Sequence, residues 1–121
     1  MAIKVSNQYI KGWNTATIKD VYVEYDIPTD YGDRNFIWFE FELPNGRILK
    51  QRYGFSLHKK SYLYPLAKGF FGEVSIDNDF EELIGTSWEI FAELNTGEDG
   101  KVWTNITNVR KLPNTSKGTF K

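Results

Sequence analysis

The sequence predicts an all-β domain with one short helix, arranged as a five-stranded antiparallel barrel. Five segments alternate apolar and polar residues, turn-forming residues separate them, and helical spacing occurs only between the third and fourth segments. A length of 121 residues corresponds to one domain. We expect the barrel domain to span residues 1–112 and a flexible C-terminal tail to span residues 113–121.

The first strand is predicted over residues 15–25. Its alternation changes phase near Lys19 and Asp20, which indicates a β-bulge that bends the strand sharply. Residues 26–35 are rich in turn formers and predict a long exposed loop. Trp13 precedes the strand, and we expect it to pack against the strand's edge.

The second strand, residues 36–43, has the clearest alternation in the chain. An apolar core face alternates with an aromatic and acidic outer face: the first holds Ile37, Phe39, Phe41 and Leu43, and the second holds Phe36, Trp38, Glu40 and Glu42. The turn at residues 44–46 then leads into a third strand, residues 47–55.

The length of that turn decides how the second and third strands pair. A two-residue turn would place Phe39 opposite Arg52, which mixes core with charge. A three-residue loop with Gly46 in the left-handed conformation instead places Trp38 opposite Arg52. This second register also pairs Glu40 with Lys50 and turns Leu49, Tyr53 and Phe55 toward the core. We choose it because it satisfies both faces of the sheet.

The remaining elements complete the order found in the OB-fold. Leucines and phenylalanines have helical spacing over residues 57–72, although a proline and a glycine limit the helix length. A short helical turn is predicted over residues 79–85 with Asp79 as its N-cap, and two further strands over residues 87–94 and 101–109. A bent first strand and a helical connector between strands three and four are typical of this barrel. The expected core contains Ile37, Phe39, Phe41, Leu49, Tyr53, Trp88, Ile90 and Ile106.

Composition excludes several kinds of site. Cysteine is absent and His58 is the single histidine, so disulfides, thiolate metal sites and multi-histidine sites cannot form. The acidic cluster at residues 77–82 lacks the glycine and the distant glutamate of a calcium loop, and helix capping explains it more simply. No glycine-rich phosphate loop or Ser/His/Asp arrangement occurs. We therefore expect no enzymatic activity, no metal and no cofactor.

Neither a membrane-spanning segment nor a secretory signal is visible, so we expect a cytoplasmic protein with no membrane partner. Charge is unevenly distributed although the net charge is −1. Residues 43–71 carry six Lys or Arg and no Asp or Glu, whereas residues 73–99 carry nine acidic and no basic residues. A basic region of this kind can bind a polyanion, because local potential matters more than the total charge.

Binding a nucleic-acid single strand needs a cationic groove with aromatic platforms. In the chosen register, aromatic and basic side chains of the second and third strands share the outer face that OB-folds use for oligonucleotides. The candidate nucleic-acid-binding residues are Phe36, Trp38, Lys50, Arg52 and Gly54 on these strands, Lys59 and Lys60 beside them, and Tyr31 and Arg34 on the first loop. The alternative is that the N-terminal segment, or a partner subunit of a homo-oligomer, covers this face.

The strand order, the connector over residues 57–72 and the Phe-Glu-Glu-Leu-Ile-Gly segment at residues 80–85 are also those of a known family. On these features the chain resembles the small single-stranded DNA-binding-like OB-fold proteins encoded by phages and other mobile elements. The resemblance implies a sequence-tolerant single-stranded DNA-binding protein that acts in replication or recombination. One departure is the basic C-terminus, residues 118–121, where bacterial single-strand-binding proteins carry an acidic partner-docking tip.

A second function stays open. Exposed tryptophan and tyrosine side chains also bind sugars and peptides, so the chain is alternatively a protein- or carbohydrate-binding β-module, or a phage-type inhibitor of a host protein. The basic stretch at residues 47–68 favours the nucleic-acid hypothesis, because a sugar-binding site does not need it.

Overall fold

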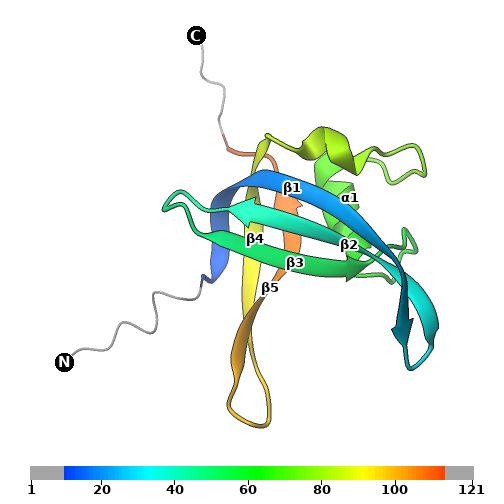
Figure 1. The fold of residues 1–121 in the computed structure, drawn as a ribbon. Helices are drawn as coiled ribbons and strands as arrows, with labels where there is room; N and C mark the ends of the chain where they lie inside the picture. The colour runs from blue at the N-terminus through cyan, green and yellow to red at the C-terminus, as the bar shows by residue number, and fades with distance from the viewer. Residues whose placement is uncertain (1–9, 114–121) are drawn as a thin grey trace.

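The computed structural model describes residues 10–113, so residues 1–9 and nearly all of the expected tail lie outside the described part. Five antiparallel strands form one sheet in the order β3-β2-β1-β4-β5, and a short helix and a 3₁₀ turn lie between the third and fourth strands (Figure 1). The elements are β1 (Gly12–Thr29), β2 (Gly32–Glu42), β3 (Ile48–Gly54), α1 (Leu63–Phe71), η2 (Phe80–Leu83), β4 (Ser87–Thr96) and β5 (Val102–Arg110). The predicted fold class is therefore confirmed.

β1 belongs to both halves of the sheet because it bends. Residues 12–17 pair with β4, and residues 17–29 pair with β2. The register shifts between Ile18 and Asp20, next to the point where the Asp20 carboxylate accepts a hydrogen bond from the Val21 N–H at 2.9 Å. This is the predicted bulge, and in Figure 1 the strand curves across the molecule from one half of the sheet to the other.

The prediction of a long loop over residues 26–35 is wrong. β1 continues to Thr29 and β2 begins at Gly32, so the segment is a β-hairpin with a tight turn. A second bulge contains Asp26, whose φ is 58° and whose N–H donates to the side-chain oxygen of Asn35 at 3.0 Å. The turn formers in this segment therefore mark a bulge and a turn.

The register predicted for β2 and β3 is confirmed. Gly46 has a φ of 87°, as the three-residue loop requires. Trp38 lies opposite Arg52, and Glu40 lies opposite Lys50. The alternating side chains of both strands are thereby sorted into a core face and an outer face, and the candidate site depends on this sorting.

The barrel stays open between β3 and β5, because no backbone ladder joins these two strands within residues 10–113. Side chains of β3 bridge the gap. The Gln51 amide donates to the Thr104 carbonyl oxygen and accepts from the Ile106 N–H, both at 3.1 Å, and the Tyr53 hydroxyl donates to the Ile106 carbonyl oxygen. Gln51 thus occupies two backbone groups of β5 that a neighbouring strand would otherwise bind.

Helix α1 packs against β5 at a position where only glycine fits. A Cβ atom at Gly69 would overlap the carbonyl oxygen of Val109, so the helix and strand approach more closely than an alanine would allow. η2 begins as predicted, since the Asp79 carboxylate accepts from the Glu81 N–H at 3.0 Å. No helix among the described residues is long and apolar enough to cross a membrane.

The expected core is buried except for Trp88, which is half-buried beside the Phe70 ring. Phe55 was expected in the core but is 40% exposed, because β3 ends at Gly54 and the alternation ends with it. Helix α1 adds a set of buried residues that strand alternation alone does not reveal: Leu63, Leu66, Ala67 and Phe70.

Candidate functional site

The outer face of β1, β2 and β3 carries a cross-strand row of two aromatic rings and a guanidinium. Tyr22 on β1 lies opposite Trp38 on β2, which lies opposite Arg52 on β3. The Tyr22 and Trp38 rings are stacked with centroids 6.2 Å apart, and the Arg52 guanidinium carbon lies 5.8 Å from the Trp38 ring centroid. The row therefore crosses three strands as one surface of flat groups.

A second row lies beside the first and shares its cation. Phe36 has Glu24 on one side and Gly54 on the other. The Arg52 guanidinium carbon lies 4.2 Å from the Phe36 ring centroid, so one cation spans both aromatic residues on the outer face of β2. The Trp38 indole N–H donates to the Glu24 carboxylate at 2.7 Å, which fixes the ring's orientation. A Cβ at Gly54 would meet no atom within 4 Å, so the surface beside Phe36 is open.

The third row makes the charge of this face mixed. Asp20 and Lys50 lie on either side of Glu40, and the Lys50 ammonium is 3.8 Å from the Glu40 carboxylate. Because the Lys50 side chain is 60% exposed, this ion pair adds little stability. The cationic charge next to the rings therefore comes from Arg52 more than from Lys50.

The other predicted residues lie on the β1–β2 hairpin and in the connection that follows β3. Arg34 is two residues before Phe36 on β2, so strand alternation places it on the same face. Its guanidinium carbon lies 6.0 Å from the ring centroid of Tyr31, which is 86% exposed at the tip of the β1–β2 hairpin. Lys59 and Lys60 are exposed in the connection between β3 and α1. The structure thus joins Phe36, Trp38 and Arg52 closely, keeps Arg34 on the same face, and places Lys59 and Lys60 in the connection that follows β3.

Sequence reasoning missed a second surface beside this face. Trp103 is 43% exposed and lies opposite Asn95 on the β4–β5 hairpin. Glu93 pairs with Asn105 two residues further along the same ladder, so both side chains lie on the same face as Trp103. The signal in the sequence was the short Gly97–Gly100 turn, which sets the hairpin register.

The expectation that Trp13 precedes the first strand and packs on its edge is also corrected. Trp13 lies within β1, opposite Phe91 of β4, and the two rings meet edge to face at 5.1 Å. The guanidinium carbon of Arg110 lies 3.8 Å from the Trp13 ring centroid while the same group forms an ion pair with Glu89 at 2.7 Å. This cluster ties β1, β4 and β5 together on the outer surface.

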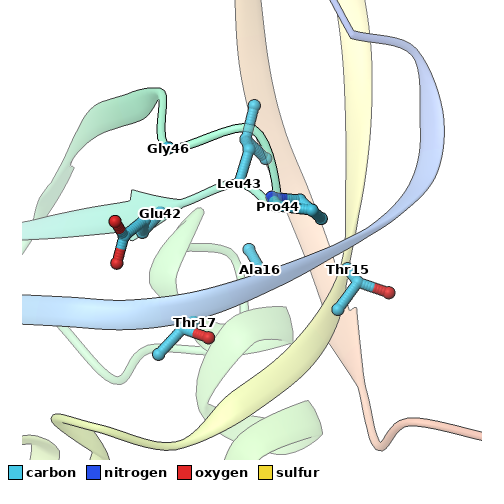
Figure 2. Close-up of a pocket in the computed structure, with 7 residues that line it drawn as sticks. All are labelled: Thr15, Ala16, Thr17, Glu42, Leu43, Pro44 and Gly46. Carbon is cyan, nitrogen blue, oxygen red and sulfur yellow. The ribbon is translucent and has the colours of Figure 1, made fainter.

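A cavity of about 380 Å³ lies between the start of β1 and the β2–β3 turn. It is lined by Thr15, Ala16, Thr17, Glu42, Leu43, Pro44 and Gly46. Figure 2 shows the carboxylate of Glu42 and the hydroxyl of Thr15 on opposite sides of this cavity. Glu42 is its single ionisable lining residue, so the cavity offers neither a paired acid and base nor a cation for a phosphate.

Several candidate catalytic or metal-binding groups in the described region have structural partners. The His58 ring accepts a hydrogen bond from the Lys60 N–H at 3.2 Å, and Asp79 caps η2. Burial raises the pKa of the Tyr53 phenol well above its usual range, and its hydroxyl is held by β5. Among residues 10–113, no group of three His, Cys, Asp or Glu side chains is placed to hold a metal ion.

No protein-family model matches the chain, and no curated protein matches it.

Proposed function

We propose that this chain is a sequence-tolerant single-stranded DNA-binding protein, and that the bound DNA lies across the outer face of β2 and β3. The row of Tyr22, Trp38 and Arg52 carries the proposal. Aromatic rings stack on any base, because every base has a π-face, and this is how sequence-tolerant binders hold single strands. Arg52 adds a cation that can meet a phosphate or stack on a base.

The surrounding cations favour single-stranded DNA over a sugar as the ligand. Arg34 is exposed on the same face, and Lys59 and Lys60 are exposed in the connection that follows β3; we expect these cations to contact phosphates of the bound DNA. The Glu24 and Glu40 carboxylates on the same face repel phosphate, so we expect the phosphates to lie toward Arg52 while the bases stack on Phe36 and Trp38. In line with the family resemblance, we propose a role in replication or recombination of a phage or mobile element in the cytoplasm.

The test is a titration of labelled oligo-dT, oligo-rU and duplex DNA at two salt concentrations. We expect the single strands to bind and the duplex to bind less well. Trp38→Ala should weaken oligo-dT binding by about 5- to 140-fold through lost stacking, with the salt slope nearly unchanged. Trp38→Phe keeps a ring while losing the bond to Glu24, so it should retain most of the affinity.

The basic residues should act on the salt slope. Arg52→Ala should flatten the slope of log affinity against log salt by about 0.7, since it removes one phosphate contact on a single strand. Lys50→Ala should flatten it less, because Glu40 already neutralises part of that charge. Lys68→Ala on the exposed side of α1 is the matched control and should leave the slope unchanged.

Two results would count against the proposal in different ways. Absence of single-strand binding by the wild-type protein even at low salt would refute the function and favour a protein- or carbohydrate-binding module. Binding affinity that is unchanged in Trp38→Ala and Arg52→Ala would support the DNA-binding function but would show that the binding site lies on another surface.

A further inference from the structure

A cleft of about 450 Å³ lies outside the gap between β3 and β5. Its polar and aromatic lining includes Arg52, Tyr62, Glu93, Asn95, Asn105 and Thr107. The cleft exists because Gln51 bridges the two strands with its side chain, so no strand fills the space outside the bridge. Its volume falls within the range of small-ligand sites, about 300–1,000 Å³.

The polar groups of the cleft retain free hydrogen-bonding capacity. Asn95 and Asn105 are half-buried, and within the described chain their side-chain amides form no hydrogen bond. One carboxylate oxygen of Glu93 accepts from the Thr107 hydroxyl at 3.1 Å, which positions the carboxylate and leaves its other oxygen free to accept. The cleft therefore offers two amides and an oriented carboxylate to a ligand.

Aromatic groups lie in and beside the cleft, and one cation is shared between the cleft and the surface proposed to bind DNA. Tyr62 lines the cleft and is 81% exposed, and Trp103 shares the strand face of Glu93 and Asn105. Arg52 lines the cleft and also contacts the Phe36 and Trp38 rings. A strand crossing the outer face of β2 and β3 would thus reach the cleft at Arg52.

We propose that this cleft takes one base of the bound DNA strand and favours the 4-amino group of cytosine or the 6-amino group of adenine over the 4-carbonyl oxygen of thymine. The proposal rests on the proposed single-strand function. A carboxylate accepts from an amino group, and an asparagine amide can pair with the adjacent donor and acceptor of adenine. Thymine presents a carbonyl oxygen where cytosine carries its amino group, and that oxygen faces repulsion from Glu93.

The experiment compares the affinities of oligo-dC, oligo-dA and oligo-dT of equal length for the wild-type protein and two variants. Wild type should bind oligo-dC and oligo-dA about fivefold or more tightly than oligo-dT. Glu93→Gln should strengthen oligo-dT binding and bring both ratios close to one, because an amide serves a carbonyl as well as an amino group. Glu98→Gln removes the same charge from the exposed turn of the same hairpin and should leave the ratios unchanged.

The outcomes separate the two proposals. If the wild-type protein binds none of the three strands, the single-strand function is refuted and the base-selective cleft with it. If it binds all three with equal affinity, or if Glu93→Gln leaves the ratios as they were, the selective cleft is overturned while the single-strand function stands.

Discussion

Replacing Gln51 with methionine should open the gap between β3 and β5. Methionine has a similar length but no amide, so Gln51→Met removes the hydrogen bonds to the Thr104 carbonyl oxygen and the Ile106 N–H. Each such bond contributes about 0.5–1.5 kcal/mol net, so the free energy of unfolding should fall by roughly 1–3 kcal/mol. For a domain of this size, that loss lowers Tm by about 4 °C per kcal/mol.

Urea unfolding and amide hydrogen exchange measure the two parts of this effect. The midpoint should fall, and the Ile106 amide should exchange faster because it loses its acceptor. Lys50→Met is the matched control: it makes the same replacement one residue away, at an exposed side chain whose surface ion pair contributes little. Its unfolding free energy should stay within about 0.5 kcal/mol of wild type.

Gln51→Glu adds a pH test of the same bridge. At neutral pH the introduced carboxylate can accept from the Ile106 N–H but cannot donate to the Thr104 carbonyl oxygen, so part of the stability is lost. Near pH 4, close to the ordinary glutamate pKa of about 4.3, a growing fraction of the carboxyl is protonated and regains a donor. The stability deficit relative to wild type should therefore shrink on acidification. The bridging role of Gln51 would be refuted if Gln51→Met were as stable as Lys50→Met, or if the stability difference between Gln51→Glu and wild type did not change with pH.

The remaining predictions concern the frame that supports the face. Gly69→Ala should destabilise the protein by about 1–3 kcal/mol in urea unfolding, because the added methyl group overlaps Val109. Alanine usually stabilises a helix relative to glycine, so this is the reverse of the normal effect. Lys68→Ala is the control, and a Gly69→Ala variant more stable than wild type would contradict the close approach of helix and strand. The raised pKa of buried Tyr53 means that the unfolded state loses this proton first, so above pH about 10 stability should fall by about 1.4 kcal/mol per pH unit more in wild type than in Tyr53→Phe. Equal pH slopes in the two proteins would show that Tyr53 titrates normally. Gly46→Ala should cost about 1–2 kcal/mol of unfolding free energy, since its φ of 87° strains any side chain, and an unchanged midpoint would exclude that strain.

The register of β2 and β3 could be predicted from sequence because two local signals agreed. Only the three-residue turn with Gly46 kept charge out of the core, and it placed Trp38 beside Arg52. The β1–β2 hairpin could not be predicted in the same way. Its turn-forming residues serve a bulge at Asp26 as well as a turn, and composition does not distinguish these from a loop.

The bridge across the open side of the barrel was harder to foresee. Gln51 occupies a core position of β3, where alternation predicts an apolar side chain, and its partners are backbone groups of β5 more than fifty residues away. Such a contact depends on how the strands are finally placed, and no local pattern encodes it. The cleft follows from that placement, so the sequence alone did not reveal it.

The divided pairing of β1 also sets an order of assembly during folding. The β1–β2, β2–β3 and β4–β5 ladders join strands that are consecutive in the chain, whereas the β1–β4 ladder joins residues 70 to 80 positions apart, from Thr17 with Ser87 to Gly12 with Ala92. The Thr17 and Ser87 hydroxyls form a hydrogen bond of 2.8 Å at one end of this ladder. Closing so long a loop costs entropy before any contact compensates it, so non-local pairings of this kind are slow to form. We therefore expect the three-stranded meander that carries Trp38 to form first, and the cleft beside β5 to exist only after the chain has closed on itself.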